Sequence, residues 1–183
     1  ARRALEIRSG RTPLCVERAR QLRVHFADVL GVFTVVANPS SMNLIVIGLS
    51  HHTSPVELRE RFAFAENKIP TALKQLRENK IADEAVILST CNRVEIYGVS
   101  PWVHGRVQQL FQELTSSDFD FTPHLYVKEG AEAARHLFAV ASGLDSLVIG
   151  ETEITGQVKN AYQAAKDAGL VGKKMNRLFQ TAL

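Results

Sequence analysis

The chain has 183 residues, of which 45% are hydrophobic and 22% charged, a balance typical of one ordinary globular domain with appendages. No apolar run approaches the roughly 20 residues needed to cross a bilayer, and two distant cysteines argue against a disulfide framework or a metal site. The net charge of +3 arises in the first 41 residues, which hold seven arginines and three acids, so it says little about nucleic-acid binding by the remainder.

Residues 1–41 differ in composition from the rest of the chain. They contain Arg without Lys, do not begin with Met, and end in Asn38-Pro39-Ser40-Ser41 directly before Met42. We therefore expect the protein to begin at Met42 and this leader to be upstream or non-native sequence. Two targeting interpretations remain open: an Arg-rich transit peptide, and a signal peptide with its apolar core at Val29–Ala37.

The first elements after Met42 are a predicted strand and two predicted helices. Leu44–Leu49 is a short apolar run rich in β-branched residues, typical of a strand covered on both faces. Ser54-Pro55-Val56-Glu57 has the pattern of a capping box, which predicts a short helix that begins there. The next helix should end at Asn79, and its apolar face consists of Ile69, Leu73 and Leu76.

Two further strands, a helix and a last strand complete the predicted sheet. The strands are Ala85–Leu88, Val94–Val99 and His124–Lys128. The helix begins at Pro101 and carries apolar residues at three- and four-residue steps: Val103, Val107, Leu110, Phe111 and Leu114. The order β-α-α-β-β-α-β predicts an α+β fold close to the split βαβ plan, an antiparallel sheet covered by helices on one face.

Three helices follow the predicted sheet. They are Ala131–Ser142, which Gly143 should end, Ile154–Ala168, with Gly169 suited to its C′ position, and a last helix from Lys173 onward. The last helix has apolar residues at Met175, Leu178, Phe179 and Ala182. No Gly-x-Gly-x-x-Gly turn follows a strand, so we expect no dinucleotide site in this chain.

Cys91 stands in Ser89-Thr90-Cys91-Asn92-Arg93, between two predicted strands. A tight turn there would present the thiol at a tip that a substrate can reach. The cation of Arg93 would favour the thiolate, which is the nucleophilic form of cysteine. The alternative is that Cys91 is a small buried apolar residue, as most free cysteines are.

Three motifs in order resemble the glutamyl-tRNA reductase family. They are STCNRVEIY at 89–97, GLSHHTSPVELRE at 48–60 and RHLFAVASGLDSLVIGETEITGQVKNAY at 135–162. Together they cover nearly all of 42–183. The resemblance implies a ferredoxin-like catalytic glutamate-recognition domain at 42–150, after the leader at 1–41, with linking helices at 151–183 at the start of a cofactor domain that this fragment lacks.

The resemblance also implies an activity and partners. The family's enzymes form a thioester from glutamyl-tRNA and reduce it with NADPH to glutamate-1-semialdehyde, the first step of tetrapyrrole biosynthesis. We therefore expect glutamyl-tRNA as substrate, NADPH in a domain not present here, and a homodimer formed through missing C-terminal helices. Handover of the product to glutamate-1-semialdehyde aminomutase, no membrane association and a bacterial cytoplasmic location, with the plastid as alternative, are further expectations.

By position, the family motif makes Cys91 the nucleophile, flanked at the substrate by Thr90, Asn92 and Arg93. The Arg93 guanidinium could hold a carboxylate through two parallel bonds and so select glutamate. His136 matches the family histidine near the thiol and would serve in positioning or proton transfer; alternatively, it is a histidine at the edge of the core. His51 and His52 are weaker candidates to line the pocket.

A second group of residues falls where the family contacts the glutamyl group: Ser146, Glu151, Thr152, Glu153 and Gln157. Glu151 could hold the α-ammonium group, and Ser146 and Gln157 could donate to a carboxylate or carbonyl. Glu153 departs from the family's usual glutamine, and a carboxylate there would repel glutamate unless it faces away. The alternative for this group is a helix N-terminus, where the dipole favours acids.

Three functions are consistent with these features. The first is the catalytic part of a glutamyl-tRNA reductase. The second is a thiol acyl-hydrolase or acyltransferase without a reduction step. The third is a non-enzymatic module that binds a partner and keeps Cys91 for redox sensing.

Overall fold

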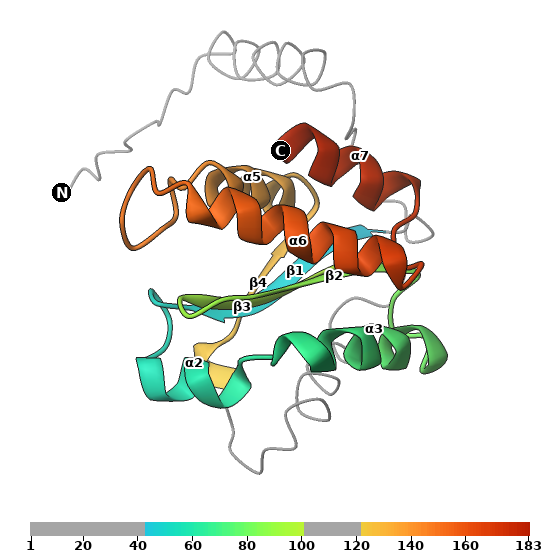
Figure 1. The fold of residues 1–183 in the computed structure, drawn as a ribbon, viewed down its shortest axis with the longest axis horizontal. Coiled ribbons are helices and arrows are strands. Elements are labelled where there is room, and N and C mark those ends of the chain that lie inside the picture. Colours follow the sequence, from blue (N-terminus) through green and yellow to red (C-terminus); the bar gives the residue numbers. More distant parts are fainter. Residues whose placement is uncertain (1–42, 101–121) are drawn as a thin grey trace, which may run out of the picture. The chain divides into compact units, whose positions relative to one another are not determined.

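The computed structural model describes residues 43–100 and 122–183, which form a four-stranded antiparallel sheet with helices (Figure 1). The strand order is β2-β3-β1-β4. The strands are β1 Asn43–Ser50, β2 Glu84–Ser89, β3 Arg93–Ser100 and β4 Tyr126–Glu129. This order and pairing confirm the predicted α+β class and the split βαβ sheet. The helix predicted from Pro101 lies outside the described residues.

Helices cover both faces of the sheet, whereas the split βαβ plan predicted one. Figure 1 shows α2 and α3 on one side and α5, α6 and α7 on the other. The helices are α2 Val56–Phe62, α3 Ile69–Glu78, α5 Gly130–Ala141, α6 Glu153–Asp167 and α7 Lys173–Ala182, with 3-10 turns at Glu66–Lys68 and Thr122–His124. Coverage of both faces explains why β1 and β2 are continuous apolar runs.

Side chains of β3 alternate between the two helical layers. Tyr97 packs edge-on against Phe179 of α7, with ring centroids 5.5 Å apart. Two residues earlier, Glu95 reaches His136 of α5. Because strand side chains alternate, Val94 and Ile96 point to the layer of α2 and α3. Polar side chains of β3 are therefore buried on the same side as the last three helices.

Most helix ends agree with the sequence prediction, but the predicted capping box at the start of α2 does not form. The Ser54 hydroxyl donates to the Ser50 carbonyl oxygen at 3.1 Å, and Pro55 takes the N-cap position of α2 without a side-chain cap. Gly143 and Gly169 follow α5 and α6 with φ of 71° and 70°, the left-handed conformation that glycine adopts at low cost. Ser54 thus stabilises the β1–α2 connection instead of the helix.

The helices α6 and α7, expected as a link to a further domain, pack on the sheet. The described residues fall into one compact unit, and Phe179 is fully buried. A carboxylate from the sheet caps α7: Glu84 Oε2 accepts the backbone N–H groups of Gly172 at 3.1 Å and Met175 at 2.7 Å. None of the described helices has the length and apolar character required to cross a membrane.

Candidate active site

Cys91 lies exposed at the tip of the β2–β3 hairpin. The Thr90 hydroxyl oxygen accepts the backbone N–H groups of Asn92 at 3.2 Å and Arg93 at 3.1 Å, and the Thr90 N–H donates to the Arg93 carbonyl at 2.8 Å. These bonds close the turn around Cys91 and leave its side chain outside. The predicted turn is confirmed, and the alternative of a buried apolar cysteine is wrong.

Two neighbouring segments hold the backbone of this tip. Arg59 of α2 donates through Nε to the Cys91 carbonyl oxygen at 3.1 Å and through Nη1 to the Ser54 carbonyl oxygen at 2.6 Å. The His51 N–H donates to the Asn92 carbonyl oxygen at 2.9 Å. Arg59 is buried, so these bonds are shielded from water. No local pattern distinguishes Arg59 in the sequence, because a helical arginine is usually a solvated one.

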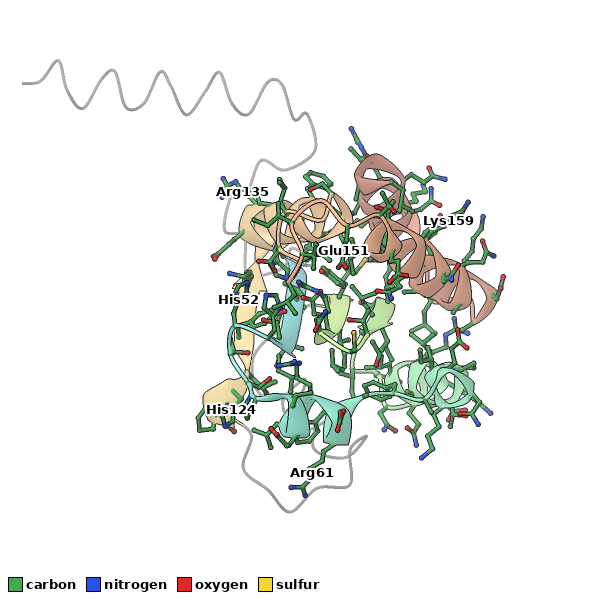
Figure 2. The ribbon with its side chains drawn as sticks, turned by 60° about the vertical axis from the view of Figure 1, so that its left-hand side comes forward. His52, Arg61, His124, Arg135, Glu151 and Lys159 are labelled. Atoms are coloured by element: carbon green, nitrogen blue, oxygen red, sulfur yellow. The ribbon has the colours of Figure 1, made fainter. Side chains whose placement is uncertain are left out.

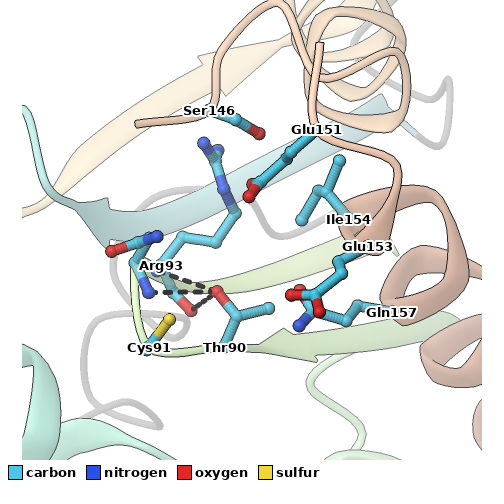
Figure 3. A pocket seen from close by; sticks show the side chains of 9 residues that line it. Thr90, Cys91, Arg93, Ser146, Glu151, Glu153, Ile154 and Gln157 are labelled. Atoms are coloured by element: carbon cyan, nitrogen blue, oxygen red, sulfur yellow. Dashed lines mark hydrogen bonds between the residues drawn. The ribbon is translucent and has the colours of Figure 1, made fainter. Parts of the chain in front are cut away.

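A small open pocket of about 310 Å³, including its solvent-filled mouth, lies beside the tip (Figure 3). Eight of the ten predicted site residues line it, and Ile154 is the one addition: Thr90, Cys91, Asn92, Arg93, Ser146, Glu151, Glu153, Ile154 and Gln157. Residues from the hairpin form one side, and the α5–α6 connection with the first turns of α6 forms the other. Segments about 50 residues apart in the chain therefore meet at one thiol.

Arg93 is buried and already paired, which differs from the free fork expected from the sequence. Its side chain is 1% exposed, and Nη1 lies 2.7 Å from Glu95 Oε1 and 3.1 Å from Asp145 Oδ2. Nη2 donates to the Asp145 carbonyl oxygen. In Figure 3 the side chain extends away from Cys91 toward Ser146. The guanidinium thus ties the hairpin to the α5–α6 connection, and Arg93 is also among the residues that line the pocket.

Glu95 is the centre of a buried polar cluster behind Arg93. Its Oε1 accepts from Arg93 Nη1, from the Tyr126 hydroxyl and from His136 Nε2 at 2.8 Å, and its Oε2 accepts from the Tyr97 hydroxyl at 2.5 Å. Because a carboxylate only accepts, His136 carries its proton on Nε2. The four donors together satisfy a carboxylate that is fully buried.

Gly48 of β1 makes room for this cluster. It pairs with Glu95 on one side and with Tyr126 on the other, so the two side chains meet above it. A Cβ atom at Gly48 would lie 2.5 Å from the Val94 carbonyl oxygen and 2.8 Å from Glu95 Cγ. Only glycine therefore fits at this strand position, because any side chain would collide with the neighbouring strand.

The electrostatics of the cluster follow from burial and pairing. Burial alone would raise the pKa of Glu95, but the hydrogen bond from His136 and the charge of Arg93 lower it from 4.5 to about 2. Burial and the Glu95 charge raise the pKa values of Tyr97 and Tyr126, so both hydroxyls remain donors. Burial lowers the pKa of Arg93, but the charge and hydrogen bond of Glu95, together with the charges of Tyr126 and Asp145, raise it overall.

Two predicted site residues do not line the pocket. His136 bonds to Glu95, so a second buried side chain stands between it and Arg93. Thr152 is the N-cap residue of α6 and is exposed. Of the weaker candidates, His52 Nε2 lies 3.3 Å from Asp145 Oδ1 and His51 has a buried Nδ1 without a partner among the described residues. Neither histidine borders the pocket.

Sequence reasoning missed the residues that hold the site together. Glu95 could have been found, since an acid inside an otherwise apolar strand at a core-facing position requires partners. Tyr126 and Asp145 carry no such local signal, because their partners are distant in the chain. Among the described residues, no group of three or more His, Cys, Asp or Glu side chains could hold a metal ion.

Comparison with known proteins agrees with this geometry. A family model described as the glutamyl-tRNA(Glu) reductase N-terminal domain matches residues 47–183. The glutamyl-tRNA reductase of Stenotrophomonas maltophilia (strain K279a) is 52% identical over 139 residues, which cover 76% of this chain and 32% of that protein. That of Shouchella clausii (strain KSM-K16) is 48% identical over 146 residues, with 78% and 32% covered.

A solved structure has the same fold. Glutamyl-tRNA reductase from Methanopyrus kandleri superimposes with a TM-score of 0.63 at 35% identity, over 76% of this chain and 32% of that one. The chain spans about a third of the length of these relatives. The family model covers most of the chain, and we conclude that the chain belongs to the glutamyl-tRNA reductase family, with residues 47–183 corresponding to its N-terminal domain.

Proposed function

We propose that this chain carries the acyl-transfer site of a glutamyl-tRNA reductase, in which Cys91 takes the glutamyl group from glutamyl-tRNA as a thioester. The observation that carries the proposal is the exposed thiol at the mouth of a polar pocket, in a chain of this family. The names of the relatives support glutamyl-tRNA as the substrate of a reduction. We propose that the product is glutamate-1-semialdehyde and that the reaction begins tetrapyrrole synthesis. The family assignment does not favour the acyl-hydrolase or redox-sensing alternatives.

The proposed step is a transfer between two nucleophiles. Cys91 Sγ attacks the ester carbonyl carbon, a carbon–sulfur bond forms, and the bond to the tRNA 3′ oxygen breaks. The proton lost by the thiol ends on that oxygen, so the step needs no other reactant. A thiolate is a stronger nucleophile at neutral pH than a hydroxyl, which suits this step. The bonds from Arg59 and Thr90 would hold the tip still while the thiol attacks.

The pocket offers groups that match a glutamyl group. Ser146 is 8% exposed and its Oγ has no partner among the described residues, so it is free to donate to a bound carboxylate or carbonyl. We assign Gln157 the same role and Glu151 the binding of the α-ammonium group. Arg93 would contribute its remaining N–H donors to the side-chain carboxylate, and Thr90 and Asn92 would border the reacting carbonyl.

His136 is proposed to act in positioning. Its Nε2–H bond to Glu95 fixes the carboxylate that in turn holds Arg93 at the pocket. Thr152 and Glu153 are proposed to shape the first turn of α6, where the helix dipole stabilises an acid. Glu153 lines the pocket, so it also remains a candidate contact of the substrate.

The remaining steps of the reaction require parts outside this chain. NADPH would supply the hydride that reduces the thioester, and we place its binding in the two thirds of the relatives that this chain does not match. A homodimer formed through later helices and handover to glutamate-1-semialdehyde aminomutase belong to the same proposal. The bacterial origin of the two relatives named above supports a cytoplasmic location.

The test is acylation of the 183-residue chain by glutamyl-tRNA, followed by the mass of the denatured protein. We expect one glutamyl adduct on the parent chain and slow release of free glutamate, because water is the only acceptor present. Cys91→Ser should abolish the thioester, whereas Cys15→Ser, the matched control, should keep it. An adduct retained by Cys91→Ser would contradict the assignment of the nucleophile.

A further inference from the structure

The last two helices carry a net positive charge, whereas the rest of the described chain has a small net negative charge. Residues 153–183 hold five basic residues, all exposed, and two acids, whereas the other described residues hold nine basic and eleven acidic residues. The five are Lys159, Lys166, Lys173, Lys174 and Arg177. Positive charge in the described part of the molecule therefore gathers on α6 and α7.

Four of these five cations, all but Lys174, lack the ion-pair partner four residues away that Lys74 and Lys128 have. Lys74 pairs with Glu78 at 3.6 Å and Lys128 with Glu132 at 3.2 Å, both four residues apart. On α6 the acid Asp167 instead accepts from Gln163 at 2.8 Å. Among the described residues, Lys159, Lys166, Lys173 and Arg177 form no ion pair. Their charge is therefore directed to solvent or to a ligand.

The position of Lys173 is also unfavourable for the fold. It is the first residue of α7, and the first turn of that helix contains no acid. The positive end of a helix dipole disfavours a cation there. Glu84 caps the backbone of this turn but comes from the sheet below. Helix stability thus gives no reason for the charge, which makes a role in binding the better explanation.

The four unpaired cations are exposed on two helices that contact each other, and we call this group the basic face: Lys159, Lys166, Lys173 and Arg177. Lys159 and Lys166 are two turns apart on α6, and Lys173 and Arg177 are one turn apart on α7. The Tyr162 hydroxyl donates to Asn176 Oδ1 at 2.5 Å and joins the two helices between these pairs. Figure 2 shows Lys159 on the outer side of its helix.

The basic face is continuous with the candidate site through α6. Glu153 and Gln157, in the first turns of α6, line the pocket. The whole helix is 15 residues, about 22 Å, long and continues past Lys159 and Lys166 toward α7. We expect the polyanionic part of a tRNA ester bound in the pocket to extend along this helix. Unpaired cations along that path would neutralise phosphates without reading bases.

We propose that the basic face binds the sugar–phosphate backbone of the tRNA whose glutamyl ester occupies the pocket. This inference rests on the proposed function and adds to it the surface that carries the RNA. Binding there is electrostatic, so the basic face binds aminoacylated and free tRNA alike, and the affinity falls steeply as the salt concentration rises. Three phosphate contacts imply a fall of about 40-fold in affinity between 50 and 200 mM KCl.

The experiment measures binding of uncharged tRNA to the 183-residue chain by fluorescence anisotropy between 50 and 200 mM KCl. The test variant combines Lys159→Glu, Lys166→Glu and Arg177→Glu. The matched control makes the same charge change on the other helical layer, with Lys68→Glu, Lys74→Glu and Lys80→Glu. Both sets are exposed, so circular dichroism should show both variants folded.

We expect the test variant to bind tRNA at least tenfold more weakly, with a salt dependence that corresponds to two to three fewer phosphate contacts. The affinity of the control variant should change less than threefold. Equal losses in the two variants would show a general effect of net charge and overturn the proposal, as would no loss in either. Loss of binding to anionic phospholipid vesicles with unchanged tRNA binding would assign the face to a membrane and also overturn it.

A second measurement separates this inference from the proposed function. Acylation of Cys91 by a small glutamyl thioester needs the pocket but no RNA contact, so the test variant should keep the parent rate within twofold. No acylation of the parent chain by the small ester would count against the proposed function alone, since tRNA binding is measured without chemistry. If the small glutamyl thioester acylates the test variant more slowly than the parent chain, these residues contribute to the pocket. That result would overturn the proposal that they bind tRNA.

Discussion

Replacement of Glu95 by glutamine tests whether the buried cluster stabilises the fold as an ionised unit. The carboxylate is fully buried and receives four donors, three on Oε1 and one on Oε2. A glutamine amide can keep its oxygen at the Oε1 position, but its NH₂ group then faces the Tyr97 hydroxyl. Arg93 also loses one of its two anionic partners, because only Asp145 remains.

The magnitude follows from the pKa of Glu95, which pairing lowers from 4.5 to about 2. That difference corresponds to about 3 kcal/mol of stability. Because the pKa is lowered in the folded state, this contribution is complete above pH 4.5 and is lost as the pH falls through 2. Removal of one partner of a buried pair costs roughly 3–5 kcal/mol in other proteins, which agrees.

The assay is urea unfolding of the parent chain and Glu95→Gln, followed by far-UV circular dichroism at several pH values. We expect Glu95→Gln to lose about 3 kcal/mol at pH 7, and the gap to the parent to narrow as the pH falls from 5 to 2. Glu84→Gln is the control, since its carboxylate accepts only backbone N–H groups among the contacts described. A gap below about 1 kcal/mol, or one independent of pH, would refute an ionised cluster.

Two other substitutions test the sheet and the hairpin tip. Gly48→Ala should destabilise the protein by about 1–3 kcal/mol in urea, because the new Cβ would lie 2.5 Å from the Val94 carbonyl oxygen. Gly98→Ala, whose Cβ would meet no atom closer than 3.6 Å, should be nearly neutral, and equal effects would contradict the steric account. Arg59→Ala removes the donor to the Cys91 carbonyl and should slow acylation tenfold or more, while an unchanged single-turnover rate would show that the tip holds its shape without it.

The structure adds to the sequence prediction mainly at contacts between distant segments. Strand and helix positions were predictable because each depends on a local pattern: apolar runs for β1 and β2, three- and four-residue steps for α3, and a glycine after α5 and α6. The capping-box prediction was wrong because the Ser54 hydroxyl donates to the Ser50 carbonyl oxygen instead of accepting from the helix. The prediction that helices cover only one face of the sheet was wrong because the periodicity of a helix does not show which element it packs against.

The sequence by itself determined the family, the strands and helices outside residues 101–121, and the cysteine that the turn presents, because motif spacing and hydrophobic period are properties of short stretches. Only the tertiary structure decided what Arg93 does. The sequence allowed a free fork for a substrate carboxylate, whereas the fold places Glu95 and Asp145 within 3.1 Å of Nη1. A buried cation must be paired where the chain brings anions to it, and which anions arrive depends on packing between segments about 50 residues apart.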